Sequence, residues 1–221
     1  MQRTEVPDTV VTRSLLILLV LALVASLAIP AFASDKRVHH LAGDFNGDGV
    51  ATPGLFVNGL FVLSGATSRG ESLRFRYGRA KDVPVVGDWN GDGVETVGVV
   101  RRGRQWFLSN SNTAGVADLT FTYGGWLGSD EPVVGDWTGK GVDRPGVVRG
   151  NTWHLRNSLA GGDADITFRY GRAGRSDQPV VGDWNGNGVD TVGVVRKGRW
   201  LLKNTHAGGQ ADWGFWYGRA S

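Results

Sequence analysis

The feature that most constrains this chain is a four-fold internal repeat. A short loop rich in Gly and acidic residues recurs four times, starting at Asp44, Asp88, Asp136 and Asp183. The successive spacings are 44, 48 and 47 residues. A Tyr-Gly pair recurs in the same phase, at Tyr77, Tyr123, Tyr170 and Tyr217. A period of this length is typical of one supersecondary unit stacked several times. The chain beyond the N-terminal segment is therefore expected to form one domain by repetition.

Each unit contains four short patterns of the β-strand type. In the second unit these are expected at 84–89, 96–101, 106–109 and 118–123. Segment 96–101 is apolar on both faces, as in a strand covered on both sides, and 118–123 alternates. No segment after residue 33 has convincing helical periodicity. The pattern predicts an all-β fold, a β-propeller of four four-stranded blades with repeats of about 47 residues. The expected blades are about 38–83, 84–131, 132–178 and 179–221.

Aromatic residues recur at two positions of every unit, where we expect them to pack between neighbouring blades. The third strands begin with Phe61, Trp106, Trp153 and Trp200, and the fourth strands are centred on Phe75, Phe121, Phe168 and Phe215. Each unit runs from its first strand to its fourth. Closure of a ring would therefore rest on side-chain packing between the first and last blades. An open solenoid and a larger ring completed by two chains are the alternatives.

The N-terminal residues 1–33 have the pattern of a secretory signal peptide. Arg13 precedes an apolar run, and the small residues Ala31 and Ala33 provide a cleavage signal before Ser34. An uncleaved membrane anchor is the alternative, although Ser26 and Pro30 interrupt the run. The expected product is a secreted, extracellular propeller of residues 34–221, with no membrane contact after cleavage.

The composition excludes several classes of function. The 24 basic and 21 acidic residues give a net charge of +3 and are spread along the chain, so no nucleic-acid patch is expected. With no Cys there are no disulfides. The four histidines lack metal-ligand spacing, and no nucleophile motif is present. We therefore expect no enzymatic activity; a hydrolase or lyase that uses carboxylates from different blades is the remaining catalytic alternative.

The repeated loops have the spacing of calcium ligands. In loops of the EF-hand type, oxygens come from positions 1, 3, 5 and 7, and Gly occupies position 6. The predicted Ca²⁺ ligands are Asp88, Asn90, Asp92, Val94 and Thr96 in unit two, Asp44, Asn46, Asp48 and Val50 in unit one, and Asp183, Asn185 and Asn187 in unit four. Unit three has Lys140 and Arg144 at ligand positions, and we expect Lys140 to neutralise Asp136. The alternative is an Asx-turn that closes each loop without metal.

These loops, together with the Val-Gly-Val-Val strands and Tyr-Gly ends, resemble the FG-GAP/VCBS-type repeats of bacterial extracellular proteins. Those repeats are related to the calcium-bearing blades of integrin α-subunits. The resemblance covers nearly all of residues 38–221, and implies a secreted or surface propeller that holds Ca²⁺ and binds glycans or proteins. The chain departs from the family pattern at the ninth loop position, where Thr52, Thr96 and Thr191 stand. Acidic residues instead appear one residue earlier, at Glu95, Asp143 and Asp190.

Three tryptophans break the repeat. Trp216 replaces polar residues at a solvent-facing position, and Trp126 lies in a loop after Tyr123; both are candidate ligand-binding residues. Trp216 could instead cover the edge where the last blade meets the first. Trp213 replaces Leu or Ile and suggests an enlarged core. The predicted function is that of a binding module for polysaccharide or a cell-surface protein, and an oligomer is compatible with the sequence. An adhesion element without a small ligand is the alternative.

Overall fold

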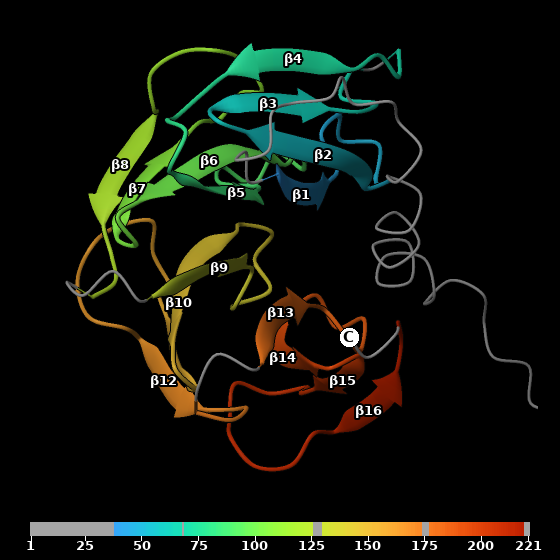
Figure 1. The fold of residues 1–221 in the computed structure, drawn as a ribbon, viewed down its shortest axis with the longest axis vertical. Helices are drawn as coiled ribbons and strands as arrows, with labels where there is room; N and C mark the ends of the chain where they lie inside the picture. The colour runs from blue at the N-terminus through green and yellow to red at the C-terminus, as the bar shows by residue number, and fades with distance from the viewer. Residues whose placement is uncertain (1–37, 68, 126–129, 174–176, 219–221) are drawn as a thin grey trace, which may run out of the picture.

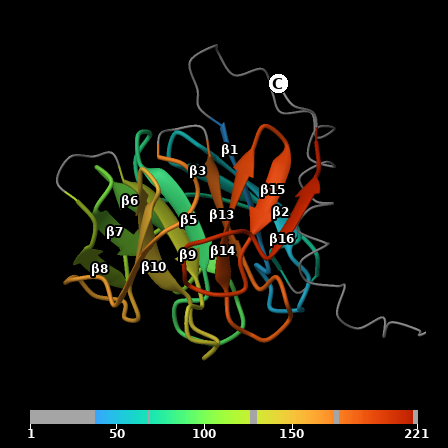
Figure 2. The ribbon, with the colours of Figure 1, turned by 90° about the horizontal axis from the view of Figure 1, so that it is seen from below.

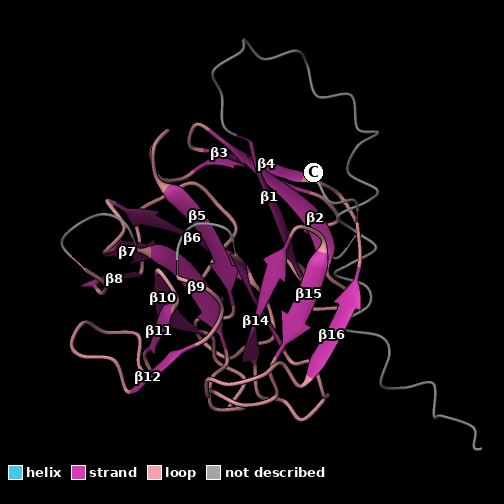
Figure 3. Ribbon diagram, turned by 60° about the horizontal axis from the view of Figure 1, so that its bottom comes forward, coloured by secondary structure: helices cyan, strands magenta, loops and turns pink. Residues whose placement is uncertain are grey.

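The computed structural model describes residues 38–67, 69–125, 130–173 and 177–218. Within these ranges the regular structure consists of β-strands without helices (Figure 3). No helix in the described part of the chain is long and apolar enough to cross a lipid bilayer. The predicted signal peptide and its alternative, the membrane anchor, lie outside the described residues.

The strands pair in sequence order into four antiparallel sheets. Blade 1 contains β1 (Val38–Gly43), β2 (Thr52–Val57), β3 (Leu60–Leu63) and β4 (Leu73–Arg76). Blade 2 contains β5 (Val83–Gly87), β6 (Thr96–Arg101), β7 (Gln105–Leu108) and β8 (Leu119–Thr122). Blade 3 contains β9 (Glu131–Gly135), β10 (Arg144–Arg149), β11 (Thr152–Leu155) and β12 (Ile166–Arg169). Blade 4 contains β13 (Gln178–Gly182), β14 (Thr191–Arg196), β15 (Arg199–Leu202) and β16 (Trp213–Trp216).

The four sheets surround a common centre, with the first strand of each sheet innermost and the fourth outermost (Figure 1). Figure 2 shows the inner strands β5, β9 and β13 side by side, and β1 likewise contacts β5. The architecture is the predicted β-propeller of four four-stranded blades. The predicted strands of blade 2 are found with ends shifted by one or two residues, since β5 begins at Val83 and β7 at Gln105.

The turn between the second and third strands is tight because the chain adopts positive φ there. In blade 2, Arg102 and Gly103 have φ of 54° and 69°. Two consecutive residues of this kind match the twist of an antiparallel hairpin. The predicted Arg102-Gly103 turn is confirmed, and Lys197 and Gly198 repeat it in blade 4 with φ of 48° and 81°.

The core lies between consecutive blades. We call the face of a blade that meets the following blade its trailing face, and the face that meets the preceding blade its leading face. At each junction, large aromatics of a trailing face cluster with small β-branched residues of the next leading face. The central pairs are Phe61 with Val99, Trp106 with Val147, and Trp153 with Val194. All six side chains are at most 3% exposed. The predicted core role of these aromatics is confirmed for blades 1 to 3.

The junction between blades 4 and 1 differs from the other three. The described residues form three apolar clusters, and each of them joins two consecutive blades. The packing between blades 1 and 4 on which closure of the ring would rest is not among them. The expectation that Trp213 enlarges the core is wrong, because its side chain is 50% exposed on the trailing face of blade 4. In the described part of the chain, no other blade covers that face.

Candidate functional site

Each acidic loop is shaped by hydrogen bonds within itself. In blade 2, the N–H groups of Gly91 and Gly93 donate to the two carboxylate oxygens of Asp88 at 2.7 and 2.8 Å. Asp44 and Asp183 accept equivalent bonds in blades 1 and 4. These are Asx-type turns, which need no metal to form. These hydrogen bonds define the conformation of each loop.

The other predicted ligands of blade 2 are divided between two places. Asn90 Nδ2 donates to Asp92 Oδ2 at 2.9 Å, and the Val94 N–H donates to Asp92 Oδ1 at 2.9 Å, so these three residues belong to the same loop as Asp88. Thr96 is buried beyond it, and its hydroxyl donates to the Ser109 carbonyl at 2.6 Å. The structure thus gives Thr96 a role in holding strands β6 and β7 together.

The same arrangement recurs in blades 1 and 4. The loop residues are Asn46, Asp48 and Val50 in blade 1, and Asn185, Asn187 and Val189 in blade 4. No group of three His, Cys, Asp or Glu side chains suited to a metal occurs in the described part of the chain. Any cation here would have to rely on amide and backbone oxygens as well as carboxylates.

In blade 3, the positively charged side chain of Arg144 lies in the acidic loop. Arg144 Nη1 lies 3.3 Å from Asp136 Oδ1, 3.0 Å from Thr138 Oγ1 and 2.7 Å from the Val142 carbonyl oxygen. These oxygens belong to positions 1, 3 and 7 of the loop, which are calcium-ligand positions in the EF-hand pattern. The prediction that Lys140 neutralises Asp136 is wrong; Arg144, at the ninth position, does so. The loop geometry thus brings three oxygens onto one positive group.

The acids that precede the ninth position do not close the loops of their own blades. Each reaches back to the preceding blade, where the backbone N–H of the first loop residue donates to it. The bonds are Asp44 N to Glu95 Oε2 at 2.7 Å, Asp88 N to Asp143 Oδ2 at 2.8 Å, and Asp136 N to Asp190 Oδ2 at 2.9 Å. The backbone N–H of each acid in turn donates to the carbonyl of the same loop residue. We call this two-way contact the junction latch.

Burial raises the pKa of all three latch acids, to about 7 for Glu95, about 8 for Asp143 and about 6 for Asp190. Nearby carboxylates raise the values further, and the accepted backbone N–H groups oppose the rise. Perturbed carboxyl groups can indicate catalysis. Here each carboxyl group already accepts a backbone hydrogen bond, so its position is explained by its structural role.

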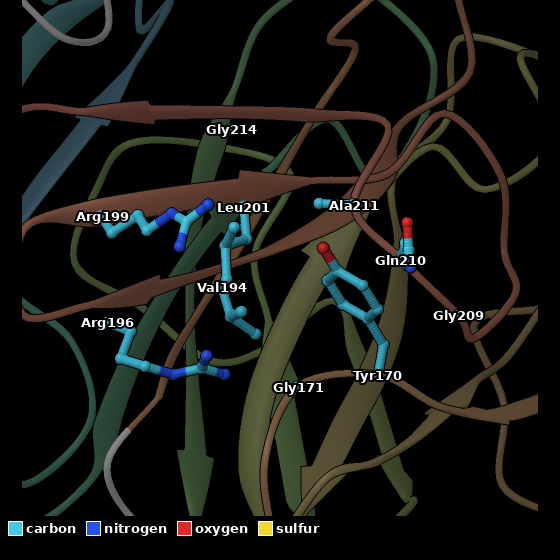
Figure 4. Close-up of a pocket in the computed structure, with 10 residues that line it drawn as sticks. All are labelled: Tyr170, Gly171, Val194, Arg196, Arg199, Leu201, Gly209, Gln210, Ala211 and Gly214. Carbon is cyan, nitrogen blue, oxygen red and sulfur yellow. The ribbon is translucent and has the colours of Figure 1, made fainter.

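A recess lies between blades 3 and 4 and has a volume of about 470 Å³. Figure 4 shows Arg196 and Arg199 entering it from one side and Tyr170 and Gln210 from the other. The Tyr170 hydroxyl is buried and has no hydrogen-bond partner in the structure. Burial raises its pKa to about 12, so it is a neutral donor at physiological pH. Asp177 holds the Arg196 guanidinium in place through two hydrogen bonds.

Two departures from the repeat shape this recess. Gly214 lines it, whereas Arg74, Thr120 and Thr167 occupy the same position in the other blades. An added Cβ at Gly214 would meet its nearest atom, Leu201 Cδ2, at 3.4 Å, which is ordinary van der Waals contact, so a side chain could be placed there without a clash. Trp216 pairs with Arg199 across β15 and β16, and both therefore face the same side of the sheet.

Trp216 is 69% exposed, which confirms its predicted solvent-facing position. It therefore presents an accessible ring beside the recess and does not cover an edge. The other candidate tryptophan, Trp126, lies outside the described residues. Sequence reasoning found Trp216 because it breaks the repeat, but it missed Gly214, which breaks the repeat at the same strand.

A smaller recess of about 210 Å³ occupies the equivalent place between blades 1 and 2. Tyr77 and Arg101 correspond there to Tyr170 and Arg196, and Phe107 lies where blade 4 has Leu201. The Tyr77 hydroxyl is likewise buried without a partner. The inter-blade recess is thus a repeated feature that is enlarged in blade 4.

Comparisons with known proteins support the fold. No family model and no curated protein matches this chain. Among solved structures, the chain is similar to a lectin from Agrocybe aegerita described as specifically recognising non-reducing terminal N-acetylglucosamine. The identity is 16% and the TM-score is 0.51; the similarity covers 80% of this chain and 53% of that one. The chain therefore spans about half the length of the lectin. The resemblance to FG-GAP/VCBS repeats stays a prediction.

Proposed function

We propose that this protein is a secreted, non-enzymatic β-propeller that binds carbohydrate, as free glycan or polysaccharide, in the recess between blades 3 and 4. The observation that carries the proposal is the recess itself, which Arg199, Gln210 and Gly214 line. Ligand sites are concave and combine apolar walls with a few placed polar groups. This recess has that composition, since Val194 and Leu201 line it beside Arg196, Arg199 and Gln210.

Carbohydrate is the ligand class that best suits these groups. A sugar ring has a hydroxyl rim that needs donors and acceptors, and C–H faces that pack on aromatic rings. Arg199 and Gln210 supply the polar contacts, and Trp216 beside them supplies the aromatic face. The fold is shared with a lectin that recognises terminal N-acetylglucosamine, which makes such glycans the first ligands to test.

Ca²⁺ in the acidic loops of blades 1, 2 and 4 is part of the proposal. Its support is the blade 3 loop, where the Arg144 guanidinium donates hydrogen bonds to oxygens at positions 1, 3 and 7. Blade 2 has the same loop without that Arg, because Thr96 stands in its place. Asp88, Asn90, Asp92 and the Val94 carbonyl would hold the ion there. Secretion rests on the signal-peptide pattern of residues 1–33.

The test is a titration of the purified protein with glycans ending in N-acetylglucosamine, followed by a polysaccharide panel. Gly214→Thr introduces the residue that blades 2 and 3 have at this position, and should fill the recess without unfolding the blade. Trp216→Ala removes the aromatic face. We expect each to weaken binding at least tenfold, which is about 1.4 kcal/mol.

The matched control is Trp213→Leu, which changes the same strand on its opposite face and restores the residue of blades 1 and 2. It should leave glycan affinity unchanged. Absence of binding across the panel, or equal affinity of wild type and Gly214→Thr, would refute the assignment of the recess. Binding of a cell-surface protein that survives Gly214→Thr would favour the adhesion alternative.

A further inference from the structure

The trailing face of blade 4 is apolar but exposed. The positions that form the core on the trailing faces of blades 1 to 3 are occupied here by Val180, Trp184, Val195, Trp200, Leu202, Trp213, Phe215 and Tyr217. None of the eight is charged. Trp213 is 50% and Phe215 38% exposed, and Trp200 is partly exposed where Trp106 and Trp153 are fully buried. An exposed apolar patch of this kind is typical of an interaction surface.

The leading face of blade 1 is the complementary free end. Its second strand carries Pro53 and Leu55 where blade 2 has the fully buried Val97 and Val99, and both are partly exposed. Val50 is 45% exposed. At the internal junctions, the equivalent valines lie against a loop glycine of the preceding blade. The contacts are Val94 on Gly47, Val142 on Gly91 and Val189 on Gly139. Val50 therefore has the position of a contact residue at a junction.

The two free ends have the chemistry of an internal junction, with large aromatics on the trailing side and small aliphatic residues on the leading side. They lack its polar part. Ala51 stands where the other blades carry the latch acids, and Val57 stands where Arg101, Arg149 and Arg196 bind Asp82, Asp130 and Asp177. A junction built from these ends would rest on apolar burial alone. Such a contact suits reversible association better than a fixed intrachain joint.

We propose that the trailing face of blade 4 docks onto the leading face of blade 1 of a second copy of this chain. The occupant is a second copy because no apolar cluster of the described residues joins blades 4 and 1, and β1 and β13 lack the contacts that link the other inner strands, so both faces of one chain stay uncovered. Each copy carries one face of each type, so the contact is head-to-tail. Two copies related in this way form two identical junctions and complete an eight-bladed ring.

The test is the molar mass of the purified protein, measured by light scattering or sedimentation over a range of concentrations. The wild type is expected at twice its monomer mass at high concentration and to dissociate on dilution. Val50→Asp and Trp213→Lys place a charge in the leading and trailing faces respectively, and each should give a monomer. Their mixture should regain dimer, because the unchanged faces of the two variants can still form one junction.

Two controls separate docking from general surface effects. Val116→Asp places the same charge on a valine that is 89% exposed outside both faces, and Trp216→Lys changes the opposite face of β16. Both should remain dimeric. A wild type that is monomeric at its highest soluble concentration would overturn the proposal. So would a dimer that Trp213→Lys breaks and Val50→Asp leaves intact, because that result shows two trailing faces paired with each other.

Discussion

The latch acid Asp190 offers a quantitative test of how the blades are joined. Its pKa is raised to about 6 by burial and by the nearby carboxylates of Asp136 and Asp183, whereas an Asp in an unfolded chain titrates near 4. The native state therefore binds more protons than the unfolded state between about pH 4 and pH 6. The resulting stability is complete below about pH 4 and is lost as the pH rises to about 6. One pKa unit corresponds to about 1.4 kcal/mol, so the loss from this group is about 3 kcal/mol.

The variant Asp190→Asn isolates this contribution. An Asn side chain keeps an oxygen that can accept the Asp136 N–H bond, which is 2.9 Å long in the wild type, but it carries no titrating proton. The free energy of unfolding of the wild type should decrease from pH 4 to pH 7. We expect the decrease to be about 3 kcal/mol smaller in Asp190→Asn. The blade 3 loop contains Arg144 at its centre, so this junction can be studied with a chelator present.

The assay is urea unfolding followed by tryptophan fluorescence at several pH values from 4 to 8. Asp163→Asn is the control, because it makes the same chemical change at an exposed carboxylate. Its pH profile should match that of the wild type. If Asp190→Asn lost stability with rising pH as steeply as the wild type does, the raised pKa would not be a cost of closing the junction, and the reasoning would fail.

Three further predictions follow from named contacts. Adding 10 mM Ca²⁺ to the chelator-treated protein should raise its melting temperature. For a dissociation constant of about 1 mM, the stabilisation is about 1.4 kcal/mol per site. Asp92→Ala should reduce the rise in melting temperature, and Asp136→Ala should leave it unchanged. Asp82→Ala should lower the free energy of unfolding in urea by about 3 kcal/mol, because it leaves Arg101 unpaired and removes the acceptor of the Arg79 N–H. An equal loss of stability in the exposed control Asp163→Ala would contradict this reasoning. In dilute protein, Trp106→Ala should lower the free energy of unfolding by about 4 kcal/mol and Trp200→Ala by about half as much, because of these two side chains only that of Trp106 is covered by a following blade. Equal losses of stability would show that the trailing face of blade 4 is covered too.

The arrangement of each blade could be read from the sequence because its signals are local. Alternation along 118–123 places Leu119 and Phe121 on one face, and Arg102-Gly103 permits the positive φ of a tight turn. Each of these patterns is weak alone, but its recurrence in four units makes the prediction reliable. The same reasoning located the acidic loops, because ligand spacing along a turn is a property of consecutive residues.

The candidate site was only partly accessible from the sequence. Trp216 was found because an aromatic residue replaced polar ones at a solvent-facing position. Gly214, in the same strand, lacks the side chain that the other blades have at this position. This lack matters only where another blade forms the opposite wall of a recess. That wall comes from Tyr170 in blade 3, more than forty residues earlier in the chain.

The sequence by itself determined the number of blades, the strands within them and the loops between them, because all of these follow from short-range pattern and repetition. The tertiary structure decided which groups meet across the junctions. It placed Arg144 in the blade 3 loop in preference to Lys140, and it sent Asp190 back to the preceding blade. It also left Trp213 exposed, although the repeat pattern assigns that position to the core. The physical reason is that charge pairing and burial depend on the neighbouring blade, and a repeat sequence does not reveal which blade has no neighbour.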